Sequence, residues 1–284
     1  MEKIFNSSVT SKVPPLEGFR EAYTLHLADN ALILGQRNAE WCGHGPVLEQ
    51  DIAITNISLD LIGQARHFYQ YAAEIINETS NLKDSSQVLP LGEDLGGAGA
   101  TEDSLAYLRT EREFKNCLLV ELPRGDWAQT ILCQFLFSTY QFFLYTELQK
   151  SDDKQIAAIA EKSLKEVTYH LRWSSEWVIR LGDGTEESHQ RMLKAVDALW
   201  PYTGEFFEPA DYEIIAGIDF SLMKEKWLQK VKTVFEEATL KVPNPSPLGE
   251  SWMGGGKNGI HTEHMGFILA EMQSVHRTYP GAEW

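Results

Sequence analysis

Cysteine is scarce in this chain, with three in 284 residues, and no pair has the CxxC spacing. Because disulfide frameworks need paired cysteines, this pattern favours reduced thiols in a cytoplasmic protein. No apolar run approaches the roughly 18 residues of a membrane span, and the first residues lack the apolar core of a signal peptide. Lys and Arg number 25 against 41 Asp and Glu, giving a net charge of -16. Such acidity argues against nucleic-acid or membrane partners, and we expect a soluble, cytoplasmic protein.

Motifs for phosphate binding and nucleophilic catalysis are also missing, because the chain has no Walker motif and no nucleophile elbow. The glycine-rich run from Gly96 to Gly99 follows no predicted strand and precedes Thr101, a residue type that begins helices. We interpret the run as a flexible loop rather than a phosphate cradle. No βαβ alternation and no strand-like period of two is visible, which predicts an all-α protein.

Long helices are what the sequence does contain. The spacing of apolar residues predicts helices over 18–37, 47–77, 102–119, 126–150, 153–181, 185–205, 221–240 and 261–278. Four of these (18–37, 47–77, 126–150 and 153–181) have the length of bundle helices, and 126–150 is apolar nearly all round, as a central helix would be. We expect one helical domain over 1–284, with 1–17 as a loose N-terminal arm and 77–100 as a connector.

The stretch 40–76 is the focus of the predicted bundle. Its expected apolar stripe is Leu48, Ile52, Leu59, Ile62 and Phe68, widened by Ile57, Leu61 and Ala65. Four polar residues step along or beside this stripe, namely Asn56, Asp60, Gln64 and His67. A buried polar group without a partner costs about 1–3 kcal/mol, so these side chains must be paired or must bind something.

A di-iron bundle needs four carboxylates and two histidines, with a Glu-x-x-His pair on each of two helices. The literal match is Glu186-x-x-His189, whose place at a helix start we interpret as capping. Looser pairs stay open as ligands or as ordinary polar residues: Glu40 with His44, Glu166 with His170, and His261 with His264. Spacing alone therefore predicts an oxygenase-like bundle without the oxygenase metal set.

Three blocks carry a resemblance to a known family: EWCGHGPVLEQDIAITNISLDLIGQARHFYQYAAE, KEVTYHLRWSSEWVIRLGDGTEES and GGKNGIHTEHMGFILAEMQ. They resemble the C subunits of the multicomponent phenylacetyl-CoA 1,2-epoxidases, over nearly the whole chain from about Tyr23 onward. The resemblance implies a ferritin-like helical bundle with additional C-terminal helices. It also implies a non-catalytic subunit that pairs with a catalytic ferritin-like subunit, which holds the di-iron centre and epoxidises the aromatic ring.

By the same resemblance, the positions that hold ligands in the catalytic subunit fall here on Ala31, Leu61, Gln64, Ser138, Val167 and His170. One imidazole without carboxylates cannot hold two irons, so we expect no metal in this chain. The resemblance further places acyl-CoA contacts at Glu113, Phe114, Lys115, Asn116, Ile214, Ile215 and Ala216. Lys115 is the side chain suited to a phosphate, although backbone groups could serve as well.

The preferred hypothesis is a structural subunit of a hetero-oligomer that supports a catalytic partner and contributes to phenylacetyl-CoA binding. Self-association into a homodimer stays open. Two alternatives are a stand-alone di-metal oxygenase or oxidase and a metal-free protein that binds an acyl-CoA on its own. The apolar and aromatic residues of the C-terminal third predict a subunit interface at 243–272; those residues are Trp227, Phe235, Trp252, Met253, Met265, Phe267 and Trp284.

Overall fold

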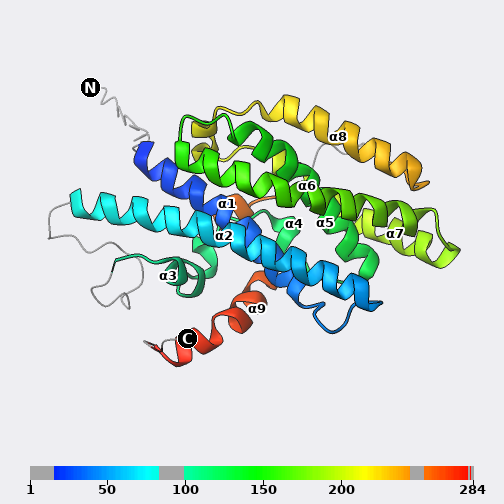
Figure 1. Cartoon of the computed structure of the whole chain (residues 1–284), viewed down its shortest axis with the longest axis horizontal. Helices are drawn as coiled ribbons and strands as arrows, with labels where there is room; N and C mark the ends of the chain where they lie inside the picture. Colours follow the sequence, from blue (N-terminus) through cyan, green and yellow to red (C-terminus); the bar gives the residue numbers. More distant parts are fainter. Residues whose placement is uncertain (1–15, 83–98, 244–252, 281, 283–284) are drawn as a thin grey trace, which may run out of the picture.

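Four long helices form the centre of the molecule (Figure 1). The computed structural model describes residues 16–82, 99–243, 253–280 and 282, and every regular element in these ranges is a helix. The long helices are α1 (Leu16–Ala39), α2 (Leu48–Leu82), α5 (Trp127–Leu148) and α6 (Lys154–Gly182). Helix α1 packs along α2, α5 packs along α6, and a contact between α2 and α6 closes the bundle. The all-α prediction is confirmed.

Local sequence signals explain where the bundle helices begin. The Asp126 side chain accepts a hydrogen bond from the backbone N–H of Gln129 at 3.0 Å and so caps α5. Asp153 caps α6 by accepting from the N–H groups of Gln155 and Ile156. Such caps satisfy backbone donors that have no partner within the helix. Both helices begin within one residue of the predicted position.

Helix α5 is the central helix that its composition predicts. Its buried residues face all directions around the helix axis, from Ile131 and Leu132 to Phe135, Leu136 and Phe137, each 0% exposed. It packs against α6, α7 (Glu186–Leu199) and α8 (Phe220–Glu237). Burying a Leu or Phe side chain contributes about 1.5–3 kcal/mol, so α5 accounts for much of the core.

The predicted apolar stripe of α2 is partly wrong. Its core face is formed by Ile54, Ile57, Leu61, Ala65 and Phe68, each at most 1% exposed. Leu48, Ile52 and Leu59 instead face solvent with exposed fractions of 71%, 51% and 62%. Helix α2 is therefore apolar on two faces, and only one of them packs in this chain.

The predicted helix over 102–119 is also wrong. Helix α3 (Glu102–Tyr107) ends early, a 3-10 turn covers Glu111–Glu113, and α4 covers only Leu118–Glu121. Residues 114–117 between them are not helical. Side chains from distant elements bond the backbone groups of this segment, as described below, so a helix is not needed to satisfy them.

The second half of the chain adds shorter helices that pack outside the four long ones. The predicted helix 185–205 stops at Leu199 and continues as a 3-10 helix over Trp200–Phe207, because Pro201 lacks the N–H that an α-helix would use. Two further 3-10 helices are η3, which covers Asp211–Ala216, and η4, which covers Gly256–Asn258. The predicted helix 261–278 is divided into α9 (Glu263–Met272) and α10 (Ser274–Thr278).

Parts of the predicted N-terminal arm and of the 77–100 connector lie outside the described residues, which resume at Gly99. Helix α2 continues to Leu82, beyond the predicted end at 77, and Thr101 caps α3 as expected. Within the described ranges, no helix is long and apolar enough to cross a membrane. The assignment of 1–284 to one domain stays a prediction.

Candidate functional site

The six positions that the sequence resemblance assigns to metal ligands all lie inside the bundle. Ala31 is on α1, Leu61 and Gln64 on α2, Ser138 on α5, and Val167 and His170 on α6, each at most 1% exposed. Three of the six have apolar side chains with no donor atom. Ser138 accepts a hydrogen bond from Gln134 at 2.7 Å, so its oxygen is engaged.

The polar residues beside these positions pair with one another. His170 Nε2 lies 3.0 Å from Asp60 Oδ2, and Gln64 Nε2 donates to Glu166 Oε2 at 2.9 Å. His67 donates from Nδ1 to the Gly63 carbonyl at 2.6 Å and accepts at Nε2 from Lys162 at 3.1 Å. The expectation that the polar groups of α2 find partners within the bundle is confirmed for Asp60, Gln64 and His67. Asn56 is exposed and needs none.

These residues do not fit a di-iron centre. Two irons in a ferritin-like bundle require four carboxylates and two histidines, whereas the six positions supply one imidazole and no carboxylate. Across 16–82, 99–243 and 253–282 where described, no three His, Cys, Asp or Glu side chains are grouped so that they could hold a metal ion.

Other contacts also engage the literal Glu-x-x-His match and the histidines of two looser pairs. Glu186 is exposed and accepts from Gln190, while His189 bonds the Gly182 carbonyl at 2.7 Å beside the capped start of α7. His44 lies in an exposed turn 3.1 Å from the Cys42 carbonyl. Both ring nitrogens of His261 are engaged, one with Glu121 and one with the Phe114 carbonyl.

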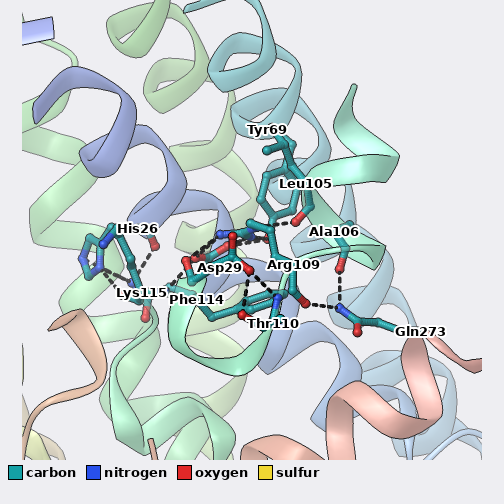
Figure 2. A network of polar contacts seen from close by, with 12 residues as sticks. His26, Asp29, Tyr69, Leu105, Ala106, Arg109, Thr110, Phe114, Lys115 and Gln273 are labelled. Carbon is teal, nitrogen blue, oxygen red and sulfur yellow. Dashed lines mark hydrogen bonds and ion pairs between the residues drawn. The ribbon is translucent and has the colours of Figure 1, made fainter. Parts of the chain in front are cut away.

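The predicted acyl-CoA contacts at 113–116 belong to a segment held on both sides by buried side chains. We call residues 113–118 the anchored segment. Asp29 Oδ2 accepts from the Lys115 N–H at 2.8 Å, and His26 Nδ1 lies 2.7 Å from the Lys115 carbonyl (Figure 2). Farther along, Asn30 accepts from the Cys117 N–H and Glu205 accepts from the Leu118 N–H. The segment is therefore fixed in a non-helical path inside the molecule.

Arg109 and Asp29 form the buried ion pair at the start of this segment, with side chains 3% and 0% exposed. Arg109 Nη1 lies 3.1 Å from Asp29 Oδ2, Nη2 contacts Asp29 Oδ1, and Nη1 also donates to the Glu113 carbonyl at 3.0 Å (Figure 2). Tyr69 donates to Asp29 at 2.5 Å, and its pKa is raised well above its usual value by burial first and by Asp29 next. The guanidinium lies over the Phe114 ring, 4.1 Å from its centre.

The structure brings the two predicted acyl-CoA segments together. Lys115 Nζ lies 5.4 Å from the centre of the Tyr212 ring in η3, the helix that carries Ile214, Ile215 and Ala216. The pKa of Lys115 is lowered, mainly by burial, while the nearby Asp29 opposes that shift.

The side chains of the predicted contacts differ in accessibility. Ile214 is 70% exposed, whereas Phe114 and Asn116 are fully buried. Lys115 and the outer face of η3 therefore offer the accessible side chains of this region. Whether they contact an acyl-CoA stays a prediction.

A second buried ion pair joins η3 to the C-terminal part of the chain. Lys257 Nζ lies 2.9 Å from Glu213 Oε2, and the Tyr212 hydroxyl donates to the Lys257 carbonyl at 2.9 Å. His26 Nε2 faces Glu213 Oε1 at 3.6 Å. Burial lowers the pKa of His26, although Glu213 opposes the shift.

A pocket of about 340 Å³ opens beside the end of η3. It is lined by Phe143, Glu147, Lys150, Ser151, Ala216, Gly217, Ile218, Asp219, Leu222, Met223 and Lys226. Lys150 lies 2.7 Å and Lys226 lies 3.7 Å from Glu147, so neither ammonium is free for an anion.

Sequence reasoning missed the buried charges that hold this region together, namely Asp29, Arg109, Glu121, Glu205, Glu213 and Lys257. One of them did leave a signal, since Asp29 interrupts the apolar stretch around Ala28 and Ala31. A charged residue within an apolar helix face indicates a buried partner. The partner itself, Arg109, lies 80 positions away and had no local signal.

Comparisons with known proteins show which family the chain belongs to. The family described as phenylacetic acid catabolic protein matches residues 19–284. The chain is 43% identical over 268 residues to the C subunit of 1,2-phenylacetyl-CoA epoxidase from Escherichia coli strain K12, which is 93% of this chain and 98% of the relative. The predicted resemblance and the ferritin-like helical fold are confirmed. The chain therefore belongs to the phenylacetic acid catabolic protein family.

Proposed function

We propose that this chain is a non-catalytic structural subunit of a phenylacetyl-CoA epoxidase in phenylacetate catabolism. It holds no metal of its own, pairs with a catalytic di-iron subunit and contributes to the acyl-CoA site. The proposal is supported by the side chains inside the bundle: Ala31, Leu61 and Val167, at the positions that the resemblance assigns to ligands, are buried and apolar, and His170 is engaged by Asp60. A bundle built this way packs like an oxygenase and lacks the charge that two irons require.

The alternatives are less well supported. A stand-alone di-metal oxygenase would need at least three His, Cys, Asp or Glu side chains grouped around a metal, and the described residues contain no such group. A solitary acyl-CoA-binding protein would not account for the apolar side chains that α2 and α9 expose. The relative from Escherichia coli is named as a subunit, which favours a partner of a different kind.

The direct test is co-purification. The tagged chain, expressed with a catalytic subunit that carries two Glu-x-x-His motifs, is expected to elute with that subunit in a defined ratio. Activity with phenylacetyl-CoA is expected to be higher when both chains are present than with the catalytic subunit alone. Separate elution of the two chains at micromolar concentrations would contradict the pairing.

The exposed apolar side chains indicate where the partner binds. On α2 they are Leu48, Ile52 and Leu59, and toward the C-terminus they are Met253, Ile260 and Phe267, the last 69% exposed. Apolar side chains of this kind form the centres of subunit interfaces. The interface predicted at 243–272 stays a prediction for Met253, Ile260 and Phe267, which are exposed.

The interface prediction is wrong for three residues. Trp227, Phe235 and Met265 are at most 1% exposed and belong to the core. Trp252 and Trp284 lie outside the described residues.

Replacing both Leu48 and Leu59 by aspartate is expected to weaken the complex at least about tenfold, because losing a central apolar contact costs about 2 kcal/mol or more. Both side chains are mainly exposed, so the isolated chain should keep its melting temperature. Binding can be measured by calorimetry with the catalytic subunit. The control is Leu222→Asp on α8, a 47% exposed leucine on a different helix. If Leu222→Asp lowers the affinity for the catalytic subunit as much as the α2 double variant does, the exposed face of α2 is not the specific contact.

Lys115 tests the acyl-CoA part of the proposal. Lys115→Glu is expected to lower the affinity of the assembled complex for phenylacetyl-CoA, because a carboxylate at this position repels the phosphates of CoA. Assembly should be unchanged, since the main-chain bonds of Lys115 to Asp29 and His26 stay in place. The matched control is Lys232→Glu on α8, where the lysine is 70% exposed. An unchanged ligand affinity would remove Lys115 from the binding site.

A further inference from the structure

His261 connects the C-terminal part of the chain to the anchored segment. Its Nδ1 lies 2.7 Å from Glu121 Oε2, and its Nε2 lies 3.0 Å from the carbonyl oxygen of Phe114. The side chains of His261 and Glu121 are both 0% exposed. Water therefore does not substitute for either contact.

Both contacts can form only if His261 carries two ring protons. A neutral imidazole has one N–H and one lone pair, while a carboxylate oxygen and a peptide carbonyl are both acceptors. With one proton, the bare nitrogen would face an acceptor oxygen at hydrogen-bond distance, which is repulsive. The imidazolium donates to both oxygens and makes a charge-assisted bond to Glu121.

The surroundings of Glu121 show that the proton belongs to the histidine. Glu121 Oε1 accepts from the Thr262 N–H at 2.6 Å, and Oε2 also accepts from Asn116 Nδ2 at 2.9 Å. A carboxyl group that accepts several hydrogen bonds is stabilised in its ionised form. The pair is therefore an imidazolium and a carboxylate.

The neighbouring charges favour the same state. Burial alone would lower the pKa of His261, but the bond and charge of Glu121 on α4, the Phe114 carbonyl and the charge of Asp29 on α1 outweigh it. The pKa of His261 therefore lies above its usual value of 6.5. Two cations lie close to these groups: Arg109 pairs with Asp29, and Arg37 on α1 donates to the backbone carbonyl of Glu121.

The same C-terminal stretch also reaches the second predicted acyl-CoA segment. Gly255 donates its N–H to Glu205 at 2.9 Å, and Lys257 pairs with Glu213 of η3. Residues 255–262 thus bond to both parts of the candidate site, through Lys257 at η3 and through His261 at the anchored segment.

We propose that His261 is a positioning residue that acts as an imidazolium, locks the backbone at Phe114 and, through Glu121, the side chain of Asn116, and thereby makes acyl-CoA binding depend on one buried proton. The ligand part of this inference rests on the proposed function. Because the folded pKa is raised, the lock is complete below about pH 6.5, the value of an unperturbed histidine, and is lost as the pH rises through the folded pKa. The anchored segment then loosens.

The first experiment detects the proton and needs no ligand. Nitrogen-15 NMR of the full chain labelled in histidine is expected to show an imidazolium signal that persists above pH 6.5, the usual pKa of histidine, and that is missing from His261→Gln. The titration of exposed His44 in the same spectra is the internal reference. A His261 that loses its proton below pH 6.5 would overturn the inference. If His261→Gln folds poorly, Glu121→Gln is the second variant that assigns the His261 signal. The protonation state is then read from the wild-type spectrum.

The second experiment measures the consequence. Amide exchange at 113–118 in the wild-type chain is expected to accelerate by roughly tenfold or more, beyond the intrinsic pH effect, as His261 loses its proton. In His261→Gln the segment should exchange fast at every pH. The control His189→Gln, which removes a bond to the Gly182 carbonyl, should behave as wild type. A wild-type profile in His261→Gln would show that the histidine does not lock the segment.

The third experiment connects the lock to the ligand. The affinity of the assembled complex for phenylacetyl-CoA should fall in the wild type as the pH rises from 6.5 through the folded pKa of His261, and should be low and independent of pH in His261→Gln. If Lys115→Glu leaves affinity unchanged while the NMR and exchange results hold, the ligand role fails and the proton lock stands. If the pH profile of affinity persists in His261→Gln, the lock does not control binding.

Discussion

Purified alone, the chain is expected to leave phenylacetyl-CoA unchanged even when ferrous iron, a reductant and oxygen are supplied. Oxygen activation in a ferritin-like bundle depends on carboxylates that balance the charge of both metals. Here the positions that the sequence resemblance assigns to ligands carry Ala31, Leu61, Gln64, Ser138 and Val167, which supply no charge, together with His170. The measurement is product formation by chromatography, with oxygen uptake as a second readout.

The matched experiment adds the catalytic subunit. Turnover should appear with both chains and exceed that of the catalytic subunit alone, because under the proposed function this chain would pack against that subunit and stabilise its active conformation. The double variant Leu48→Asp and Leu59→Asp should lose this stimulation in proportion to its lost binding. Epoxide formation by the lone chain would refute the structural-subunit proposal.

Replacing Arg109 by methionine is expected to lower the free energy of unfolding by about 3–5 kcal/mol, the usual cost of leaving one member of a buried ion pair alone. The substitution removes the guanidinium from Asp29 and from the Glu113 carbonyl, and both lie inside the protein. Tyr69 and the Lys115 N–H still bond Asp29, but they do not neutralise its charge. Urea unfolding of the isolated chain measures the difference.

Two controls separate burial from charge. Arg191→Met breaks the ion pair with Glu187, whose side chains are 52% and 75% exposed, and should cost less than about 1 kcal/mol. Adding Asp29→Asn to Arg109→Met should recover part of the lost stability, because the orphaned charge is removed. A loss within about 1 kcal/mol for Arg109→Met alone would mean that the pair does not hold the anchored segment.

The long helices could be predicted because their signals are local. Apolar spacing and the caps at Asp126 and Asp153 lie within a few residues of each helix start. The packed face of α2 could not be predicted as well, since Leu48 and Leu59 follow the same spacing as core residues. Periodicity shows that a face is apolar; it does not show whether the face packs within the chain or against another protein.

The anchored segment was missed for a different reason. The helix predicted over 102–119 assumes that backbone groups bond within the segment, whereas here the bonds come from Asp29, His26 and Glu205. Similarly, His261 and Glu121 are 140 positions apart, and only the fold brings them together. Such pairs leave no spacing signal in a single sequence.

The iron content of the purified chain is the most direct measure of whether it has a metal centre. After incubation with ferrous iron without oxygen and removal of loosely bound metal, well under one iron per chain is expected. His170→Ala should leave that content unchanged and lower the melting temperature, because it removes the partner of Asp60. The catalytic subunit, treated in the same way, is the positive control. About two irons per chain, lost in His170→Ala, would contradict the proposal.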